Sequence, residues 1–98
     1  MNADFPIHLI NTKRMIDIAF PGGLTEAQYL GVLKALYPHM SDRNLSQVMA
    51  ACSNYSEAKI SNDIAKVAGM RETEIPGLPS VLRNLKRSGL DNWMAEDN

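Results

Sequence analysis

Apolar residues recur every three or four positions along most of the chain, which is the spacing of one face of an α-helix. The first such stripe is formed by Leu9, Ile16 and Phe20, with Ile10 beside it. It predicts a helix from about Asp4 to Phe20, in which Asp4 serves as N-cap and Pro6 is tolerated in the first turn. The Pro-Gly-Gly run at 21–23 then ends this helix.

The sharpest signal follows this turn. Thr25 and Gln28 stand three residues apart, as in a capping box, and Leu24 and Tyr29 have the spacing of a hydrophobic staple. They predict a helix over residues 26–37. Its apolar stripe consists of Tyr29, Val32, Leu33 and Leu36.

Two further helices are expected in the middle of the chain. Ser41 is a suitable N-cap for a helix whose stripe is Leu45, Val48, Met49 and Cys52, and which loosens near Asn54. Ser61 is expected to cap a shorter helix from Asn62 to Ala68, with Asp63 supporting the dipole in its first turn. Gly69 is then a plausible left-handed stop.

The last expected helix follows the proline-punctuated connection "MRETEIPGLP". Pro79 suits a first helical position, and Gly89 fits the stop position at the other end. The apolar side is lined by Leu78, Leu82 and Leu85. Trp93 and Met94 are expected to lie beyond this helix, either folded back as a plug over the core or free to anchor a partner.

These patterns together predict an all-α fold, a compact bundle of about five short helices. Sustained alternation of β-branched residues, the sign of strands, is not seen. We expect one domain over residues 1–98, with residues 1–3 and 91–98 as loose termini.

Composition narrows the class of protein. Ten basic and 11 acidic side chains leave a net charge of -1, without the basic excess typical of proteins that bind duplex DNA. The apolar runs are only a few residues long, so a membrane partner is not expected. The N-terminus lacks the pattern of a signal peptide, and the single Cys52 suits a reducing compartment. We therefore expect a cytoplasmic location.

The stretch "FPGGLTEAQYLGVLKALYPHMS" resembles the opening pattern of a mycobacterial and rhodococcal family with a domain of unknown function, numbered three-three-four-nine. The matching positions are Phe20, Pro21, Gly23, Leu24, Val32, Leu33, Leu36 and Ser41, then Asp63, Ile64, Glu74, Ile75 and Pro76, and more loosely Val81, Leu85 and Gly89. Leu90 follows Gly89 where the family usually has tryptophan. The resemblance implies a small helical bundle with no established activity.

Candidate chemistry is sparse. Gly22-Gly23 follows a predicted helix, not a strand, and Lys34 is distant, so these glycines read as a hinge more than as a phosphate loop. His8 and His39 lack a second ligand at helical spacing, and no metal or cofactor is predicted. Cys52 is expected to be a core residue, because no partner base is visible.

The favoured function is therefore that of a non-enzymatic interaction module, self-associating or bound to another protein. We expect its contact residues to be Tyr29, Met49, Trp93 and Met94, since aromatic and methionine side chains suit partner surfaces.

Two alternatives stay open. Arg83, Lys86 and Arg87 form a basic cluster that suits a nucleic acid or an acidic partner, although the same charges also complement a helix C-terminus. A small-ligand carrier or hydrolase is less favoured, because no acid/base pair is apparent.

Overall fold

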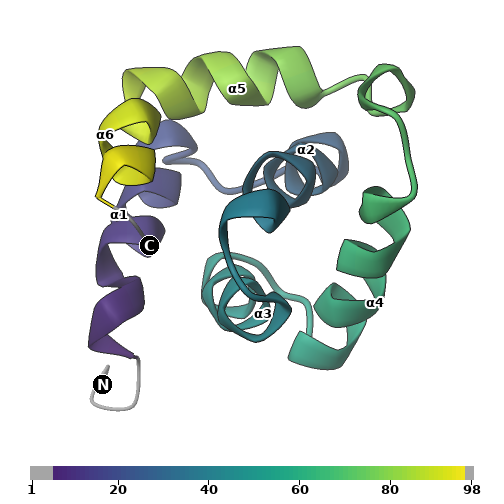
Figure 1. The fold of residues 1–98 in the computed structure, drawn as a ribbon, viewed down its shortest axis with the longest axis horizontal. Coiled ribbons are helices and arrows are strands. Elements are labelled where there is room, and N and C mark those ends of the chain that lie inside the picture. The colour runs from purple at the N-terminus through teal and green to yellow at the C-terminus, as the bar shows by residue number, and fades with distance from the viewer. Residues whose placement is uncertain (1–5, 97–98) are drawn as a thin grey trace.

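The described part of the chain, residues 6–96, contains six α-helices and three short 3-10 helices, and no strand, in a computed structural model (Figure 1). The α-helices are α1 (Ile10–Ala19), α2 (Glu26–Leu36), α3 (Asp42–Cys52), α4 (Glu57–Ala68), α5 (Leu78–Arg87) and α6 (Leu90–Ala95). The 3-10 helices are η1 (Ile7–Leu9), η2 (Tyr37–His39) and η3 (Glu72–Glu74). The predicted all-α bundle of short helices is confirmed, with one more helix than expected.

Two helix starts agree with the sequence pattern. The Thr25 hydroxyl accepts a hydrogen bond from the Gln28 backbone at 3.1 Å, and the Gln28 side chain accepts one from the Thr25 backbone at 2.9 Å. Ser41 caps α3 by accepting from the Asn44 backbone at 3.1 Å. These caps satisfy backbone N–H groups that a helix start leaves unpaired, so the local sequence sets both boundaries.

The first helix starts later than expected. Asp4, its predicted cap, lies outside the described residues. Pro6 has an extended ψ of 128°, and the chain then makes the 3-10 turn η1 before α1 begins at Ile10. The change of geometry occurs at Leu9, whose φ of -105° and ψ of 0° are not those of an α-helix.

The start predicted for the fourth helix was wrong, whereas its predicted end at Ala68 is confirmed. α4 begins at Glu57, because Ser56 is its cap and accepts from the Lys59 backbone at 3.1 Å. Ser61 lies exposed inside the helix. The extra turn brings Ile60 into the stripe of Ile64 and Val67.

Gly69 is also not left-handed. Its φ of -89° is right-handed, and its N–H bonds to carbonyls of the last turn of α4. The end of this helix is secured from outside by Lys34 of α2, whose ammonium donates to the backbone carbonyls of Val67 and Met70. A cation at a helix C-terminus complements the partial negative charge of its free carbonyls.

The tail prediction was wrong for residues 91–95, which form most of α6. Gly89 does adopt the predicted left-handed conformation, with φ of 104°, but it redirects the chain into another helix. Trp93 is only 4% exposed, and its Nε1 donates to the Thr12 hydroxyl of α1 at 2.8 Å. Of the two alternatives for Trp93, the plug over the core is the one that forms.

α2 and α3 lie in the middle of the molecule, enclosed by α1, α5 and α4 on three sides (Figure 1). α2 and α5 approach closely because glycines stand at their contacts. A Cβ on Gly31 would lie 2.7 Å from Val81 Cγ2, and one on Gly77 would lie 2.8 Å from the Ala27 carbonyl oxygen. The core around α2 therefore depends on two residues without side chains.

Candidate functional site

The sequence-predicted contact residues lie mostly in the core. Tyr29 is 1% exposed, Met49 is 0% exposed and Trp93 is 4% exposed, whereas Met94 is 39% exposed. A partner cannot reach the first three without opening the bundle. The structure therefore does not bring these four residues together as a surface, and only Met94 is available on the outside.

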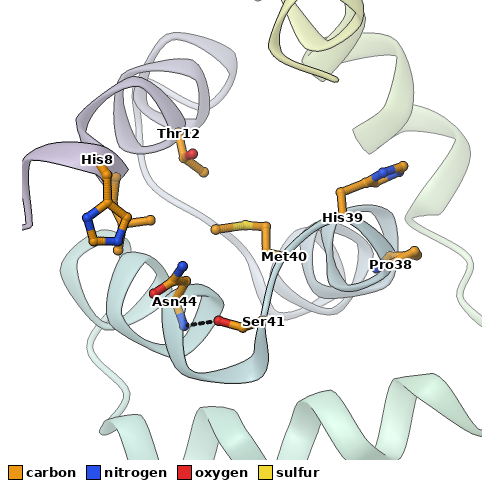
Figure 2. Close-up of a pocket in the computed structure, with 8 residues that line it drawn as sticks. His8, Thr12, Pro38, His39, Met40, Ser41 and Asn44 are labelled. Carbon is orange, nitrogen blue, oxygen red and sulfur yellow. Dashed lines mark hydrogen bonds between the residues drawn. The ribbon is translucent and has the colours of Figure 1, made fainter. Parts of the chain in front are cut away.

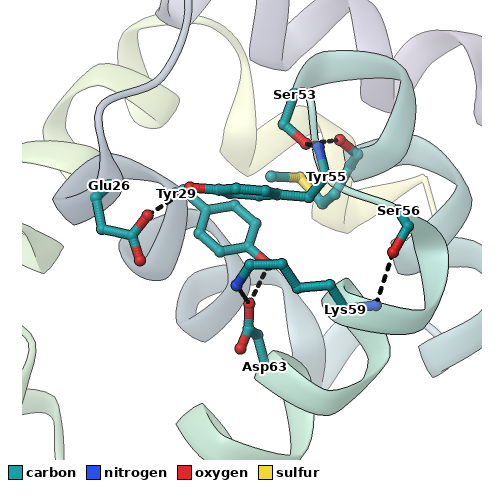
Figure 3. A network of polar contacts seen from close by, with 8 residues as sticks. Glu26, Tyr29, Ser53, Tyr55, Ser56, Lys59 and Asp63 are labelled. Carbon is teal, nitrogen blue, oxygen red and sulfur yellow. Dashed lines mark hydrogen bonds and ion pairs between the residues drawn. The ribbon is translucent and has the colours of Figure 1, made fainter.

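Tyr29 instead belongs to a polar network between α2 and α4 (Figure 3). Its hydroxyl donates to Asp63 Oδ2 at 2.7 Å, and Lys59 Nζ lies 2.7 Å from the same oxygen. Tyr55 packs its ring edge-on against Tyr29, with centroids 4.6 Å apart, and donates its hydroxyl to Glu26. The network joins α2 to the loop between α3 and α4 and to α4 itself.

Asp63 is therefore not a first-turn dipole residue, since α4 begins six residues earlier. Burial alone would raise the pKa of its carboxyl, but the hydrogen bonds from Lys59 and Tyr29 outweigh burial and lower this pKa. Burial, with the bond to Asp63, raises the pKa of Tyr29 well above its ordinary value. The network thus holds a carboxylate against a neutral phenol, as expected of a structural contact.

Cys52 is partly buried at the end of α3. Burial, with a smaller contribution from Asp17, raises the pKa of its thiol to about 11, so the thiol is protonated at neutral pH. Cys52 lines a surface pocket together with Gly22 and Gly23. These two glycines join α1 to α2, and Gly23 has a φ of 94°. This arrangement is the helix–helix corner predicted for the two glycines.

The basic cluster is solvent-facing. Arg83, Lys86 and Arg87 are all exposed on the outer side of α5, and two of them fall in its last turn. Their position complements the C-terminal end of this helix.

The outer side of α1 and η1 carries exposed apolar side chains that the sequence interpretation did not single out. Ile7 is 82% exposed, Ile18 is 59% exposed and Ile10 is 40% exposed, with the exposed Arg14 between the last two. We call Ile7, Ile10 and Ile18 the isoleucine face. Ile10, Arg14 and Ile18 are four residues apart, so they share one side of α1, opposite the buried Thr12, Met15 and Ile16.

A pocket of about 630 Å³ lies between η1 and the start of α1 on one side and η2 and the start of α3 on the other (Figure 2). Its lining consists of His8, Leu9, Thr12, Pro38, His39, Met40, Ser41 and Asn44. We call it the histidine pocket. Its volume falls within the range of small-molecule sites.

The sequence analysis predicted neither the isoleucine face nor the histidine pocket, for two different reasons. The isoleucine face has a local signal, because Ile7, Ile10 and Ile18 form a second apolar stripe on a helix that already has one. The histidine pocket has none, since His8 and His39 come from segments about 30 residues apart. Each imidazole alone reads as a surface residue.

Among residues 6–96 no group of three or more potential ligands is placed to hold a metal ion. Within the same residues no helix is long and apolar enough to cross a membrane.

Comparison of the chain with protein-family models, with curated proteins and with solved structures gave no match. The resemblance to the family of unknown function therefore stays a prediction.

Proposed function

We propose that this protein is a non-enzymatic interaction module that self-associates through the isoleucine face of α1. The observation that carries the proposal is the exposure of Ile7 on η1 and of Ile10 and Ile18 on the side of α1 that faces away from the core. Single exposed apolar residues are ordinary, but three exposed isoleucines on one side of neighbouring elements favour an interaction site.

A second copy of the chain is the occupant that the spacing of the isoleucines favours. Two α1 helices packed antiparallel around a two-fold axis near Arg14 would place Ile10 against Ile18 of the partner subunit, and the reverse. The same axis brings the two Arg14 side chains together. Asp17, which is exposed one turn along and pairs with Lys13 at 2.7 Å, offers each Arg14 a carboxylate on the partner subunit that offsets this repulsion, so apolar contact drives the association.

The expected association is weak. Full burial of an isoleucine is worth about 1.5–3 kcal/mol, and the exposed fractions of the three side chains amount to less than two isoleucines per copy. Two copies thus gain roughly 5–10 kcal/mol, against an association cost of about 4–15 kcal/mol. The favourable end of this balance, about -6 kcal/mol, corresponds to a dissociation constant of roughly tens of micromolar, so the expected contact is at its strongest a transient one.

Sedimentation equilibrium from about 20 μM to about 1 mM tests the proposal. We expect the wild-type chain to show a concentration-dependent monomer–dimer equilibrium. Ile10→Lys should abolish it, while Met94→Lys should leave it unchanged. This pair is matched, because Ile10 and Met94 are 40% and 39% exposed.

Each other outcome is informative. A wild-type chain that stays monomeric over the whole range would refute self-association. A dimer weakened by Met94→Lys and not by Ile10→Lys would move the contact from α1 to α6. Circular dichroism of both variants checks that the bundle is intact.

A further inference from the structure

The histidine pocket has two chemically distinct parts. Its apolar part is made by Leu9, Pro38 and Met40, and Figure 2 shows the Met40 side chain extended across the middle. Leu9 is 3% exposed and Met40 is partly buried against the core. This part offers a surface for an aliphatic chain, and the flexible thioether of methionine adapts well to such a ligand.

Its polar part consists of groups that can donate hydrogen bonds. His8 and His39 carry imidazoles, and the side-chain amide of Asn44 points toward the space between His8 and Met40 (Figure 2). Ser41 accepts a hydrogen bond from the Asn44 backbone, which leaves its hydroxyl hydrogen for a ligand. Among the described residues that line the pocket, none is a carboxylate.

We propose that the histidine pocket binds a small monocarboxylic acid with an aliphatic chain. The chain would lie on Leu9 and Met40, and the carboxylate would accept hydrogen bonds from His8 and Asn44. The imidazole, amide and hydroxyl groups of the lining can donate to an anion, and without an acidic side chain the described lining offers no charge that would balance a cation of the same shape. Two imidazoles without a third ligand do not make a metal centre.

The pocket contains its own reporter. Trp93 is the single tryptophan of the chain, and it touches two residues of the lining. Its Nε1 donates to Thr12 at 2.8 Å, and its ring stands edge-on to that of His39 with centroids 6.1 Å apart. A ligand that contacts Thr12 or His39 therefore changes the surroundings of the indole, and tryptophan emission reports binding.

The test compares three probes of equal chain length, namely octanoate, 1-octanol and octylammonium, each titrated below its aggregation limit and followed by tryptophan emission and by calorimetry. We expect octanoate to bind at least about tenfold more tightly than octylammonium, the effect of one hydrogen bond to a charged group. Asn44→Leu and His8→Leu should each weaken octanoate binding about tenfold and change 1-octanol binding less than about threefold.

Two control variants locate the site. Asn62→Leu removes an exposed amide from α4, which does not line the pocket, and should leave octanoate binding unchanged. Ile10→Lys should also leave it unchanged, which separates this proposal from self-association through the isoleucine face. The absence of saturable octanoate binding, equal affinity for octylammonium, or a loss caused by Asn62→Leu would each overturn the proposal.

Discussion

The hydrogen bond from Tyr29 to Asp63 is expected to be a large single contribution to the packing of α2 on α4. Tyr29→Phe keeps the buried ring and removes only the hydroxyl, which lies 2.7 Å from Asp63 Oδ2. Hydrogen bonds to charged groups are worth about 1.5–3 kcal/mol. Asp63 keeps Lys59, and 16% of its side chain stays open to solvent, so the lower end applies. We expect a loss of about 1.5 kcal/mol of unfolding free energy.

Urea and thermal unfolding followed by circular dichroism would measure this loss, with the midpoint falling by about 6–12 °C. Tyr55→Phe is the matched control. It removes a hydroxyl from the neighbouring ring, but that hydroxyl meets Glu26 at the exposed edge of the network. It should therefore cost clearly less. If Tyr55→Phe destabilises the protein as much as Tyr29→Phe does, burial is not the reason that the hydrogen bond from Tyr29 to Asp63 is strong.

The pH dependence supplies a second check on the same bond. The pKa of Asp63 is lowered in the folded protein from its usual 3.8, so its stabilising effect is complete above that value. The effect is lost as the pH falls through the lowered pKa and the carboxylate becomes protonated. The difference between wild type and Tyr29→Phe should therefore be constant near neutrality and shrink in acid below pH of about 4. A difference that grows in acid would refute the assignment of a carboxylate acceptor.

Three further substitutions test the packing. Gly31→Ala should lower the unfolding free energy by about 1 kcal/mol, because overpacking against Val81 outweighs the gain in helix propensity. A raised melting temperature would contradict the close approach of α2 and α5. Lys34→Met should cost about 1–2 kcal/mol and speed amide exchange at the end of α4, whereas the exposed Lys66→Met should do neither. Gly89→Ala forces a side chain into a left-handed φ and should cost about 1–2 kcal/mol, with tryptophan emission shifted to the red as α6 loosens; an unshifted spectrum would show that the turn tolerates it.

Sequence reasoning succeeded where the determinant is local. Thr25 with Gln28, and Ser41 before α3, carry their cap partners within three residues, so the pattern fixes the helix start without knowledge of the fold. The same holds for Gly89, whose left-handed φ depends on the absence of a side chain at that position.

It failed where the determinant is distant. Ser61 was expected to cap the fourth helix, but the helix begins after Ser56, where the earlier start buries Ile60 in the core. The six-residue α6 is too short to be stable by itself, and it forms where Trp93 reaches Thr12, 81 positions away in the chain. Short-range periodicity contains no information about such a contact.

The same distinction between local and distant determinants applies to the two candidate sites. The histidine pocket depends on which segments become neighbours, so the sequence gives no sign of it. The isoleucine face depends on a single helix, and its spacing could have been recognised. Tyr29 and Met49 were predicted as contact residues because large aromatic and methionine side chains are common at interfaces, but side chains of that size are equally suited to a core, where both lie.

α1 carries two exposed isoleucines on the side that faces away from the core, and this bears on how a partner would bind. Its inner side is already held by Thr12, which accepts from Trp93, and by Asn84 of α5, which donates to the Ala19 carbonyl at 3.4 Å. The isoleucine face makes none of these contacts, so a partner could cover it without displacing α1 from the bundle. For the same reason Ile10→Lys should leave the fold intact, since the charge enters solvent and not the core. The exposed parts of these isoleucines therefore contribute little to holding α1 in the bundle, which supports the proposal that they serve contact with another molecule.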